Sequence, residues 1–312
     1  MSNAAEANFI VTREYRRFAE FCDACRRYRY IGLCYGPPGV GKTLSARHYA
    51  NWDRAEGFDL YDPVLTEKLA AVLPCETIFY TPGVTNSPGQ IERDIHKRRD
   101  HLRSIRQEPL RLEENGVLHQ IQQREDEVRR QAWERDWFHD PPAKPEESGL
   151  GRAEVVRSYH EKRKAIPDPT TLILVDEADR LRMASLEQIR AIFDEGGIGV
   201  VLLGMSGLEK RPVRYPQFYS RVGFVHEFRS LSVADVRSLL EQHWKPTEVC
   251  QSLAGITNEE VLVAIVRITG GNFRLLHRLL SQMARVMEIN ALSGVTLQVV
   301  DAARESLVIG TV

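Results

Sequence analysis

The chain has 312 residues, of which 43% are hydrophobic and 27% are charged, and its formal net charge is −1 at pH 7. These values are typical of a globular protein with one large domain and a small one. They exclude a global positive field, so any contact with nucleic acid has to come from local basic patches. No stretch approaches the ~20 apolar residues of a membrane span, and the polar N-terminus lacks the apolar region of a signal peptide. We expect a cytoplasmic protein that has no membrane partner.

An amphipathic helix is predicted for residues 12–29. Its apolar face repeats at helical spacing and carries Tyr15, Phe18, Cys22 and Cys25. The two cysteines form a C-x-x-C pair, but no second pair follows at the spacing of a zinc site. We interpret both as buried packing residues in a reducing compartment. The opposite face is either solvated or a contact surface for a partner or DNA, and it carries Arg13, Arg16, Arg17, Arg26 and Arg27.

A phosphate-binding loop is predicted directly after the next strand. Residues 30–35 form a short apolar run, the next eight residues are G-P-P-G-V-G-K-T, and a helix begins at Leu44. This matches G-x-x-x-x-G-K-[ST] between a strand and a helix, where backbone N–H groups and the helix N-terminus hold phosphates. Lys42 can reach the β- and γ-phosphates, and the Thr43 hydroxyl can bind Mg²⁺. The predicted nucleotide contacts are Gly36, Pro37, Pro38, Gly39, Val40, Gly41, Lys42, Thr43 and Leu44.

The next region is predicted to contain a strand and a capped helix. Residues 51–75 are expected to form an irregular connection, followed by a strand at residues 77–80. Ser87 is a predicted N-cap, with Pro88 at the first helical position and Gln90 completing a capping box.

A long insertion is predicted at about residues 107–168. It contains polar helical runs at about residues 117–137 and 152–164, separated by a proline-rich break at residues 141–145. Its thin apolar stripe indicates an elaboration that projects from a compact core. Insertions of this length are usually functional or mobile.

Two adjacent acids follow a buried strand. Residues 172–175 are four consecutive apolar residues, which is typical of a strand buried on both faces of a parallel sheet. Asp176 and Glu177 come next, at the end of the strand where open α/β sheets bind their ligands. We assign Asp176 to a metal site beside Thr43, because Mg²⁺ prefers hard oxygen ligands. Glu177 is well placed to polarise the attacking water, so the two motifs together indicate hydrolysis.

Two further side chains are candidates for the γ-phosphate. Ser206 follows the strand predicted at residues 198–204, where a polar group could sense the phosphate or hold the water; an ordinary turn serine is the alternative. Arg274 opens a helix in the small domain and could reach the phosphate from there. A plain arginine at a helix start is the alternative for Arg274.

An arginine finger is also predicted. Arg221 ends a segment at the rim of the domain, just before the last strand at residues 224–228, and could enter the nucleotide site of a neighbouring subunit. Arg211 and Arg214 compete for this role. A surface arginine is the remaining interpretation of Arg221.

A small helical domain is predicted after the last strand. Ser232, Thr257 and Thr296 are candidate N-caps, and helices are expected at about residues 233–244, 258–269, 272–289 and 297–308. Before this point strands alternate with helices, which implies a parallel sheet covered by helices. We therefore predict an α/β fold with a nucleotide-binding three-layer αβα domain at residues 1–230 and an all-helical lid domain at residues 231–312.

The layout of these motifs resembles an AAA+ ATPase, and its sequence is similar to that of the TniB/TnsC/MuB-type regulators of DNA transposition. The segments that carry the resemblance are YGPPGVGKT (35–43), VDEADRL (175–181), GMSGLEKR (204–211), YPQFYSRVGF (215–224) and GNFR (271–274). It covers roughly residues 10–100 and 170–290, and the insertion departs from it.

The resemblance implies an ATPase that assembles on double-stranded DNA into rings or helical filaments when ATP is bound. Such a protein marks a target site, recruits or activates a transposase, and leaves DNA after hydrolysis. The resemblance also implies roles for individual residues. Lys42 and Thr43 would bind nucleotide and Mg²⁺, Asp176 would order the metal, and Glu177 would be the catalytic base. Arg221 would act in trans, and Arg274 would act from the lid.

Family resemblance also points to DNA contacts on the helix after the second strand, at Lys97, Arg98 and Arg99. A solvated helix face is the alternative. Two other functions stay open on the sequence: a different DNA-linked AAA+ protein, such as a helicase loader or replication initiator, and a nucleotide-gated scaffold that does not touch DNA.

Overall fold

The computed structural model describes residues 9–60, 65–135, 147–211, 215–243, 259–292 and 294–307. The chain forms two compact units, which we describe separately. The first comprises residues 1–57, 77–95 and 171–312, and the second comprises residues 58–76 and 96–170.

A five-stranded parallel sheet lies at the centre of the first unit, in the order β2-β3-β4-β1-β5. Its strands are β1 (Ile31–Tyr35), β2 (Thr77–Tyr80), β3 (Leu172–Val175), β4 (Gly199–Gly204) and β5 (Val222–Glu227). Every residue of β2, β3 and β4 is buried, as expected for apolar runs between two layers of helices. All five predicted strands are present, and the last begins at Val222 rather than Phe224.

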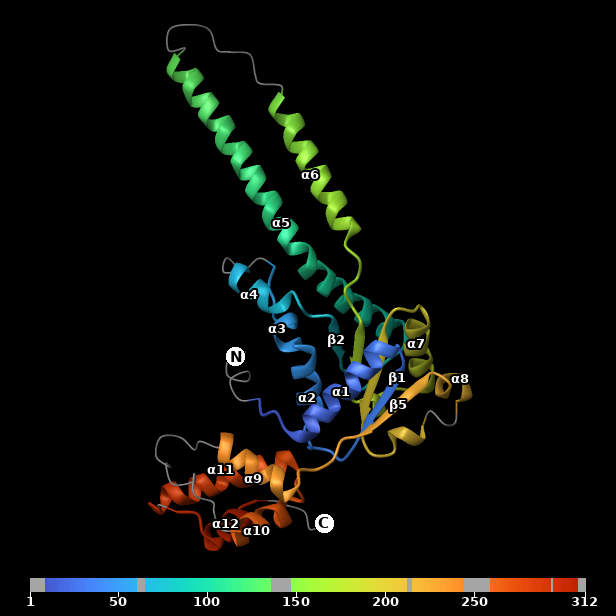
Figure 1. Ribbon diagram of the computed structural model, residues 1–312, viewed down its shortest axis with the longest axis vertical. Helices are drawn as coiled ribbons and strands as arrows, with labels where there is room; N and C mark the ends of the chain where they lie inside the picture. Colours follow the sequence, from blue (N-terminus) through green and yellow to red (C-terminus); the bar gives the residue numbers. More distant parts are fainter. Residues whose placement is uncertain are drawn as a thin grey trace. The chain divides into compact units, whose positions relative to one another are not determined.

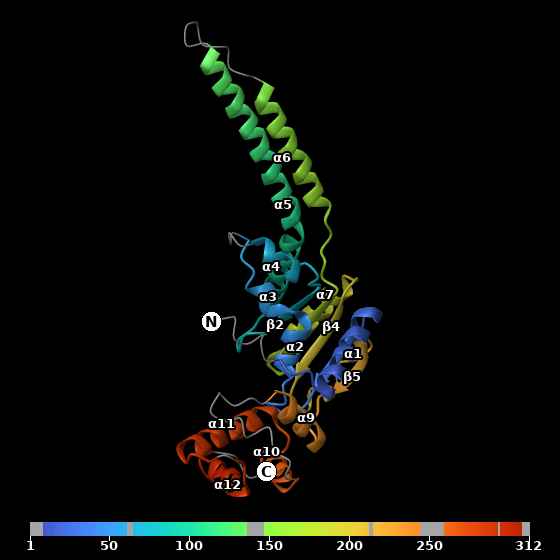
Figure 2. The ribbon, with the colours of Figure 1, turned by 60° about the vertical axis from the view of Figure 1, so that its left-hand side comes forward.

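Helices cover both faces of this sheet (Figures 1 and 2). On one face α1 (Arg13–Tyr28) packs against β4, β1 and β5, and α2 (Lys42–Ala50) packs against α1 and β2. On the opposite face lies α7 (Met183–Asp194). The α/β three-layer fold predicted from the sequence is therefore confirmed.

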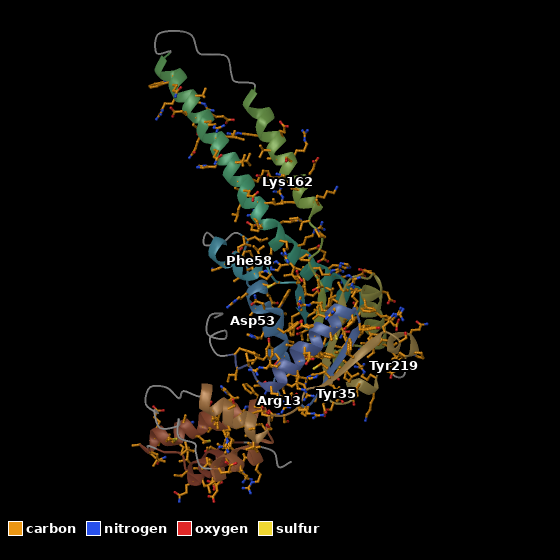
Figure 3. The ribbon with its side chains drawn as sticks, in the orientation of Figure 1. Arg13, Tyr35, Asp53, Phe58, Lys162 and Tyr219 are labelled. Carbon is orange, nitrogen blue, oxygen red and sulfur yellow. The ribbon has the colours of Figure 1, made fainter. Side chains whose placement is uncertain are left out.

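The apolar face of α1 is buried as its spacing predicted. Phe18, Cys22 and Cys25 are fully buried, and both cysteines are free thiols. Arg13 is exposed at the first turn, where Figure 3 labels it. Arg26, which the sequence assigned to a solvated or partner-binding face, instead donates to Tyr49 Oη at 2.9 Å and to Thr77 Oγ1 at 3.0 Å. It therefore contributes to packing within the unit.

A helical region follows β5. It comprises α9 (Val233–His243), α10 (Glu259–Thr269), α11 (Phe273–Ile289) and α12 (Leu297–Glu305), whose apolar faces share one buried cluster. Two of its predicted N-caps are formed: Ser232 Oγ accepts from Asp235 N at 3.2 Å, and Thr296 Oγ1 accepts from Val299 N at 3.4 Å. The third, Thr257, lies outside the described residues.

The connection after α2 is more helical than predicted. Residues 51–75 were expected to be irregular, but they contain α3 (Trp52–Glu56) and α4 (Leu65–Val72). Both are too short to be stable on local propensity. Both helices are stabilised by burial, of Trp52 in α3 and of Leu69 and Val72 in α4. The local sequence does not predict this burial.

The second unit contains most of one very long helix. This helix, α5 (Pro88–Arg135), has 48 residues and continues through Pro109, so no helix end falls near residue 107, where the insertion was predicted to begin. Ser87 caps it, with Gln90 N donating to Ser87 Oγ at 3.3 Å. The second predicted helical run is α6 (Glu147–Ala165), and the proline-rich break between the two lies outside the described residues.

α5 and α6 lie side by side in Figures 1 and 2, and polar contacts join them. Arg163 pairs with the buried Glu114, Arg152 pairs with Glu125, and Gln107 Nε2 donates to the Arg163 carbonyl at 3.0 Å. Lys162 of α6, labelled in Figure 3, lies over the ring of Tyr159. The thin apolar stripe noted in the sequence explains this reliance on charged partners.

In the part of the chain that the structure describes, no helix combines the length and the apolar character that crossing a membrane requires.

Replacing a core residue of the helical region tests its packing. Leu279 is fully buried in α11, so Leu279→Ala should lower the free energy of unfolding by about 2–5 kcal/mol through lost transfer energy and a cavity. Ile289 lies on the same helix but is 70% exposed, so Ile289→Ala should change it by no more than about 0.5 kcal/mol. Urea unfolding of both variants measures the difference. Equal effects would show that the burial of α11 is wrong.

Candidate nucleotide-binding site

The predicted phosphate-binding loop connects β1 to α2. Gly39 and Gly41 have φ angles of 81° and 107°, in the left-handed region that favours glycine. Glycine is required at position 36 for a different reason, because a Cβ there would lie 2.2 Å from the carbonyl oxygen of Phe228. α2 begins at Lys42, so its unpaired backbone N–H groups face the end of the loop. This is the geometry that binds phosphate at a helix N-terminus.

Lys42 lies folded over the loop. Its Nζ donates to the carbonyl oxygens of Gly36 at 2.8 Å and Pro37 at 2.7 Å. Partial burial lowers the pKa of Lys42 from its ordinary value, while the nearby Asp176 opposes that shift. Two neutral carbonyl acceptors thus hold the ammonium group at the loop. A charged phosphate oxygen can take their place.

The loop is joined to the end of β3 by a hydrogen bond. Thr43 Oγ1 donates to Asp176 Oδ2 at 2.7 Å. Burial raises the pKa of Asp176, and the hydrogen bond from Thr43 partly offsets the rise. A hydroxyl and a carboxylate oxygen side by side are hard ligands, which suit Mg²⁺ when nucleotide phosphates and water complete its coordination.

Glu177 has a special backbone conformation. Its φ angle is 48°, in the left-handed region that residues other than glycine seldom adopt. Its carboxylate is paired with the guanidinium of Arg180, one turn further along the chain. Such outliers cluster at functional sites, where the surrounding structure determines them.

The start of α11 rests on the loop. Asn272 Nδ2 donates to the Pro38 carbonyl at 2.6 Å, and Arg274 N donates to the Gly39 carbonyl at 3.0 Å. A Cβ at Gly39 would come within 2.6 Å of Asn272 Oδ1, so this contact also requires glycine. The helical region therefore forms one wall of the site.

These elements enclose a cleft of about 720 Å³. Its lining includes the loop, both acids after β3 and the start of α11, and comprises Pro38, Gly39, Gly41, Lys42, Thr43, Leu44, Asp176, Glu177, Asp179, Arg180, Gly204, Met205, Phe273, Arg274, His277 and Arg278. The structure thus brings Lys42, Thr43, Asp176, Glu177 and Arg274 to one cleft.

Several lining residues were missed in the sequence. His277 and Arg278 lie three and four positions after Arg274, and that spacing on one helix was a usable signal. Asp179 and Arg180 had no such signal. The Asp179 carboxylate accepts from Met205 N at 2.6 Å, which ties the end of β4 to the segment after β3.

Ser206 and Arg221 lie apart from this group. Ser206 is exposed just past β4, whereas Gly204 at the end of this strand and Met205 directly after it line the cleft. Arg221 forms ion pairs with Asp194 at 2.6 Å, close to the exposed Tyr219 labelled in Figure 3. The hydrogen bond from Arg221 holds the pKa of Asp194 below its ordinary value.

The two competitors of Arg221 have different positions. Arg211 donates to the carbonyl oxygens of Ala178 at 3.2 Å, Asp179 at 3.1 Å and Leu181 at 2.6 Å. It therefore stabilises the turn after β3. Arg214 lies outside the described residues.

Comparison with known proteins now adds to this geometry. The model of the AAA domain family matches residues 25–211. A potential ATP-binding protein of Staphylococcus aureus is 38% identical over 306 residues, which is 97% of each chain. The DNA transposition protein B of the Mu-like prophage FluMu of Haemophilus influenzae is 32% identical over 114 residues, or 34% of this chain and 36% of that protein.

A solved structure shares the fold. A mutant of RuvB from Thermotoga maritima superimposes with a TM-score of 0.50 at 12% identity, covering 96% of this chain and 72% of that one. At this identity the likeness shows the fold alone. Together with the phosphate-binding loop and the family match over more than half of the chain, it leads to one conclusion. The chain belongs to the AAA domain family and is an AAA+ ATPase that binds and hydrolyses ATP.

Proposed function

We propose that this ATPase oligomerises on double-stranded DNA and regulates transposition. In this proposal it selects a target site, recruits or activates a transposase, and leaves DNA on hydrolysis, as a ring or helical filament in the cytoplasm. The observation that carries the proposal is the 32% identity to a DNA transposition protein B over 114 residues. The motifs quoted for the TniB/TnsC/MuB resemblance support it.

The phosphate site suggests how nucleotide would be held. The N–H groups at the start of α2 and the Lys42 ammonium would take the place of water around the phosphates. Mg²⁺ would be held by Thr43 and Asp176, whose oxygens already lie 2.7 Å apart, and would offset the charge on the phosphates. Residues 36–44 would surround the phosphates of the nucleotide.

Glu177 is the proposed base for hydrolysis. Its carboxylate lines the same cleft as Lys42 and Thr43, from which it could orient the attacking water. Arg274 lies in the first turn of the helix that rests on the phosphate loop, so the helical region would respond to a bound γ-phosphate. The helical region has a buried cluster of its own, which supports the proposed division into a nucleotide-binding domain at residues 1–230 and a lid at residues 231–312.

The remaining assignments concern a neighbouring subunit and the strand end. Arg221 is proposed to act in trans, and it would have to exchange Asp194 for phosphate to do so. Ser206 is proposed to approach the γ-phosphate, which would require the segment after β4 to move toward the cleft.

The candidate DNA contacts differ in accessibility. Lys97 is exposed on α5, whereas Arg99 Nε donates to Asp168 Oδ2 at 2.6 Å and Arg98 is half-buried. We therefore propose Lys97 as the main phosphate contact of the three. Arg99 would have to leave Asp168 to bind DNA.

Nucleotide binding is tested at Lys42. Lys42→Ala should raise the dissociation constant for ATP at least about 10- to 100-fold, because it removes a charge-assisted contact to phosphate. Isothermal titration with ATP measures the change, and Lys210→Ala, an exposed lysine outside the cleft, is the matched control. Unchanged affinity in Lys42→Ala would overturn the phosphate site.

Base catalysis is tested at Glu177. Glu177→Gln should keep ATP affinity and lower kcat by about 10²- to 10⁴-fold, since the amide cannot accept the proton. Oligomers formed with ATP should persist longer in this variant. The exposed Glu20 of α1 provides the control Glu20→Gln. Normal hydrolysis by Glu177→Gln would remove Glu177 from its role.

DNA binding is tested with random duplexes across a salt series, with and without ATP. Affinity should depend on ATP and should fall steeply with salt, and Lys97→Ala should reduce the salt slope by about one. Fluorescence anisotropy measures binding, and electron microscopy shows the oligomer. Lys210→Ala should leave the slope unchanged. Absence of binding at low salt would contradict the transposition proposal and favour the nucleotide-gated scaffold.

A further inference from the structure

β5 forms one edge of the sheet. In the part of the chain that the structure describes, it pairs with β1 alone. Across this pairing, Phe228 N donates to the Tyr35 carbonyl at 2.8 Å. Main-chain groups point to alternate sides along a strand, so the N–H and C=O groups of Val225 and Glu227 point away from β1. No described residue forms a hydrogen bond with these groups. β5 therefore has an open edge that a further strand could join.

The side chains of β5 differ between its two faces. His226 stacks on Phe21 of α1 with ring centroids 5.3 Å apart, so His226 faces α1. Successive side chains alternate along a strand, so Val225 points to the opposite face, where 57% of it is exposed. Beside it, Glu227 is paired with Arg229 at 3.0 Å. Val225 thus offers an apolar contact on the face away from α1.

An aromatic cluster borders the α1 face of the edge. Tyr28, at the end of α1, and Tyr30, just before β1, are 56% and 43% exposed. Their ring centroids lie 6.0 and 5.7 Å from that of Phe224. A Cβ at Gly223 would come within 2.3 Å of the Tyr30 ring, so glycine is required for this ring to rest on the start of β5. The fold therefore holds the three rings together beside the edge.

Two arginines lie beside these rings. The Arg27 guanidinium is 5.6 Å from the centre of the Tyr28 ring, and Arg29 is exposed. Among the residues that the structure describes, no carboxylate pairs with either arginine. Arg29 also ends α1 with a φ angle of 54°, in the left-handed conformation where glycine is common. Backbone outliers of this kind cluster at functional sites. The border of the open edge thus carries positive charge.

We infer that the open edge of β5 binds an extended acidic peptide of a partner protein as an added strand. The main chain of the peptide would form hydrogen bonds with Val225 and Glu227. Its acidic side chains would face Arg27 and Arg29. The apolar side chains that alternate with them would lie on the other face and pack against Val225.

The open main chain favours a peptide over a nucleic acid. A single strand of nucleic acid could stack on the rings and pair with the arginines, but it would leave the N–H and C=O groups of the edge without partners. None of the residues named for this surface lines the nucleotide cleft. The inference therefore holds whether or not the protein acts in transposition.

Peptide binding to the full chain tests the inference directly. The probe is a short fluorescein-labelled peptide of alternating valine and glutamate residues, and fluorescence anisotropy measures its binding. A peptide of alternating valine and lysine is the matched control, because it keeps the apolar face and reverses the charge. The acidic peptide should bind at least about tenfold more tightly, since ion pairs replace repulsion at two arginines. No binding of the acidic peptide, or equal binding of both, would overturn the inference.

Amide hydrogen exchange shows where the peptide lies. The N–H groups of Val225 and Glu227 should exchange at least about tenfold more slowly when the acidic peptide is bound, because each gains an acceptor. The N–H group of His226, which points to β1, is the internal control and should change less. Binding without protection of Val225 and Glu227 would place the peptide elsewhere and contradict the proposed edge.

Two variants separate binding from folding. Val225→Pro removes an outward N–H without removing a hydrogen bond to β1, so it should abolish peptide binding and leave ATP affinity unchanged. Arg29→Gly relieves the left-handed strain, so it should weaken peptide binding about two- to fivefold without lowering the midpoint of urea unfolding. Arg13→Ala, in the exposed first turn of α1, should change neither. If Val225→Pro does not fold, Arg29→Gly decides the matter, and full peptide affinity in that variant refutes the inference.

Other occupants of the edge would give different results. If a second copy of the chain covers it, Val225→Pro should abolish ATP-dependent oligomers, which analytical ultracentrifugation detects without any peptide. If single-stranded DNA binds there, oligothymidylate should displace the labelled acidic peptide. Either result would rule out the proposed peptide. We expect the oligomers of Val225→Pro to match those of the wild type and the oligonucleotide to leave the peptide bound.

Discussion

The hydrogen bond from Thr43 to Asp176 joins the two halves of the nucleotide site. These residues are 133 positions apart, and they follow β1 and β3, which lie on either side of β4 in the sheet. Because all five strands are parallel, their carboxyl ends reach one edge, where the phosphate loop and the acids meet. This hydrogen bond contributes to stability because Asp176 is buried, and a buried carboxylate without a partner costs free energy.

The helical region takes part in the site through backbone contacts. Asn272 and the N–H of Arg274 bind carbonyl oxygens of the phosphate loop, and Gly39 leaves the space that they need. Any change in the loop on nucleotide binding therefore acts directly on the first turn of α11. That coupling is a physical basis for a helical region that responds to the nucleotide.

Charged side chains in the cleft are held by contacts that a nucleotide would rearrange. Lys42 binds loop carbonyls, Glu177 is paired with Arg180, and Asp179 accepts from the backbone of Met205. Bound phosphates would attract Lys42, Arg180, Arg274 and Arg278 at once. The resting contacts thus define which groups would move when a nucleotide binds.

The local sequence was sufficient for the phosphate loop, the five strands, the helices after β5 and the acids after β3, because each depends on spacing, caps or short apolar runs. It could not predict α3 and α4, which are stabilised by the burial of Trp52, Leu69 and Val72. Nor could it predict the partners of the arginines. Arg180, Arg211 and Arg221 look alike in sequence, yet one pairs with Glu177, one binds carbonyls after β3 and one pairs with Asp194. A long cation binds whichever acceptor the fold brings near, so the tertiary structure alone decided these roles.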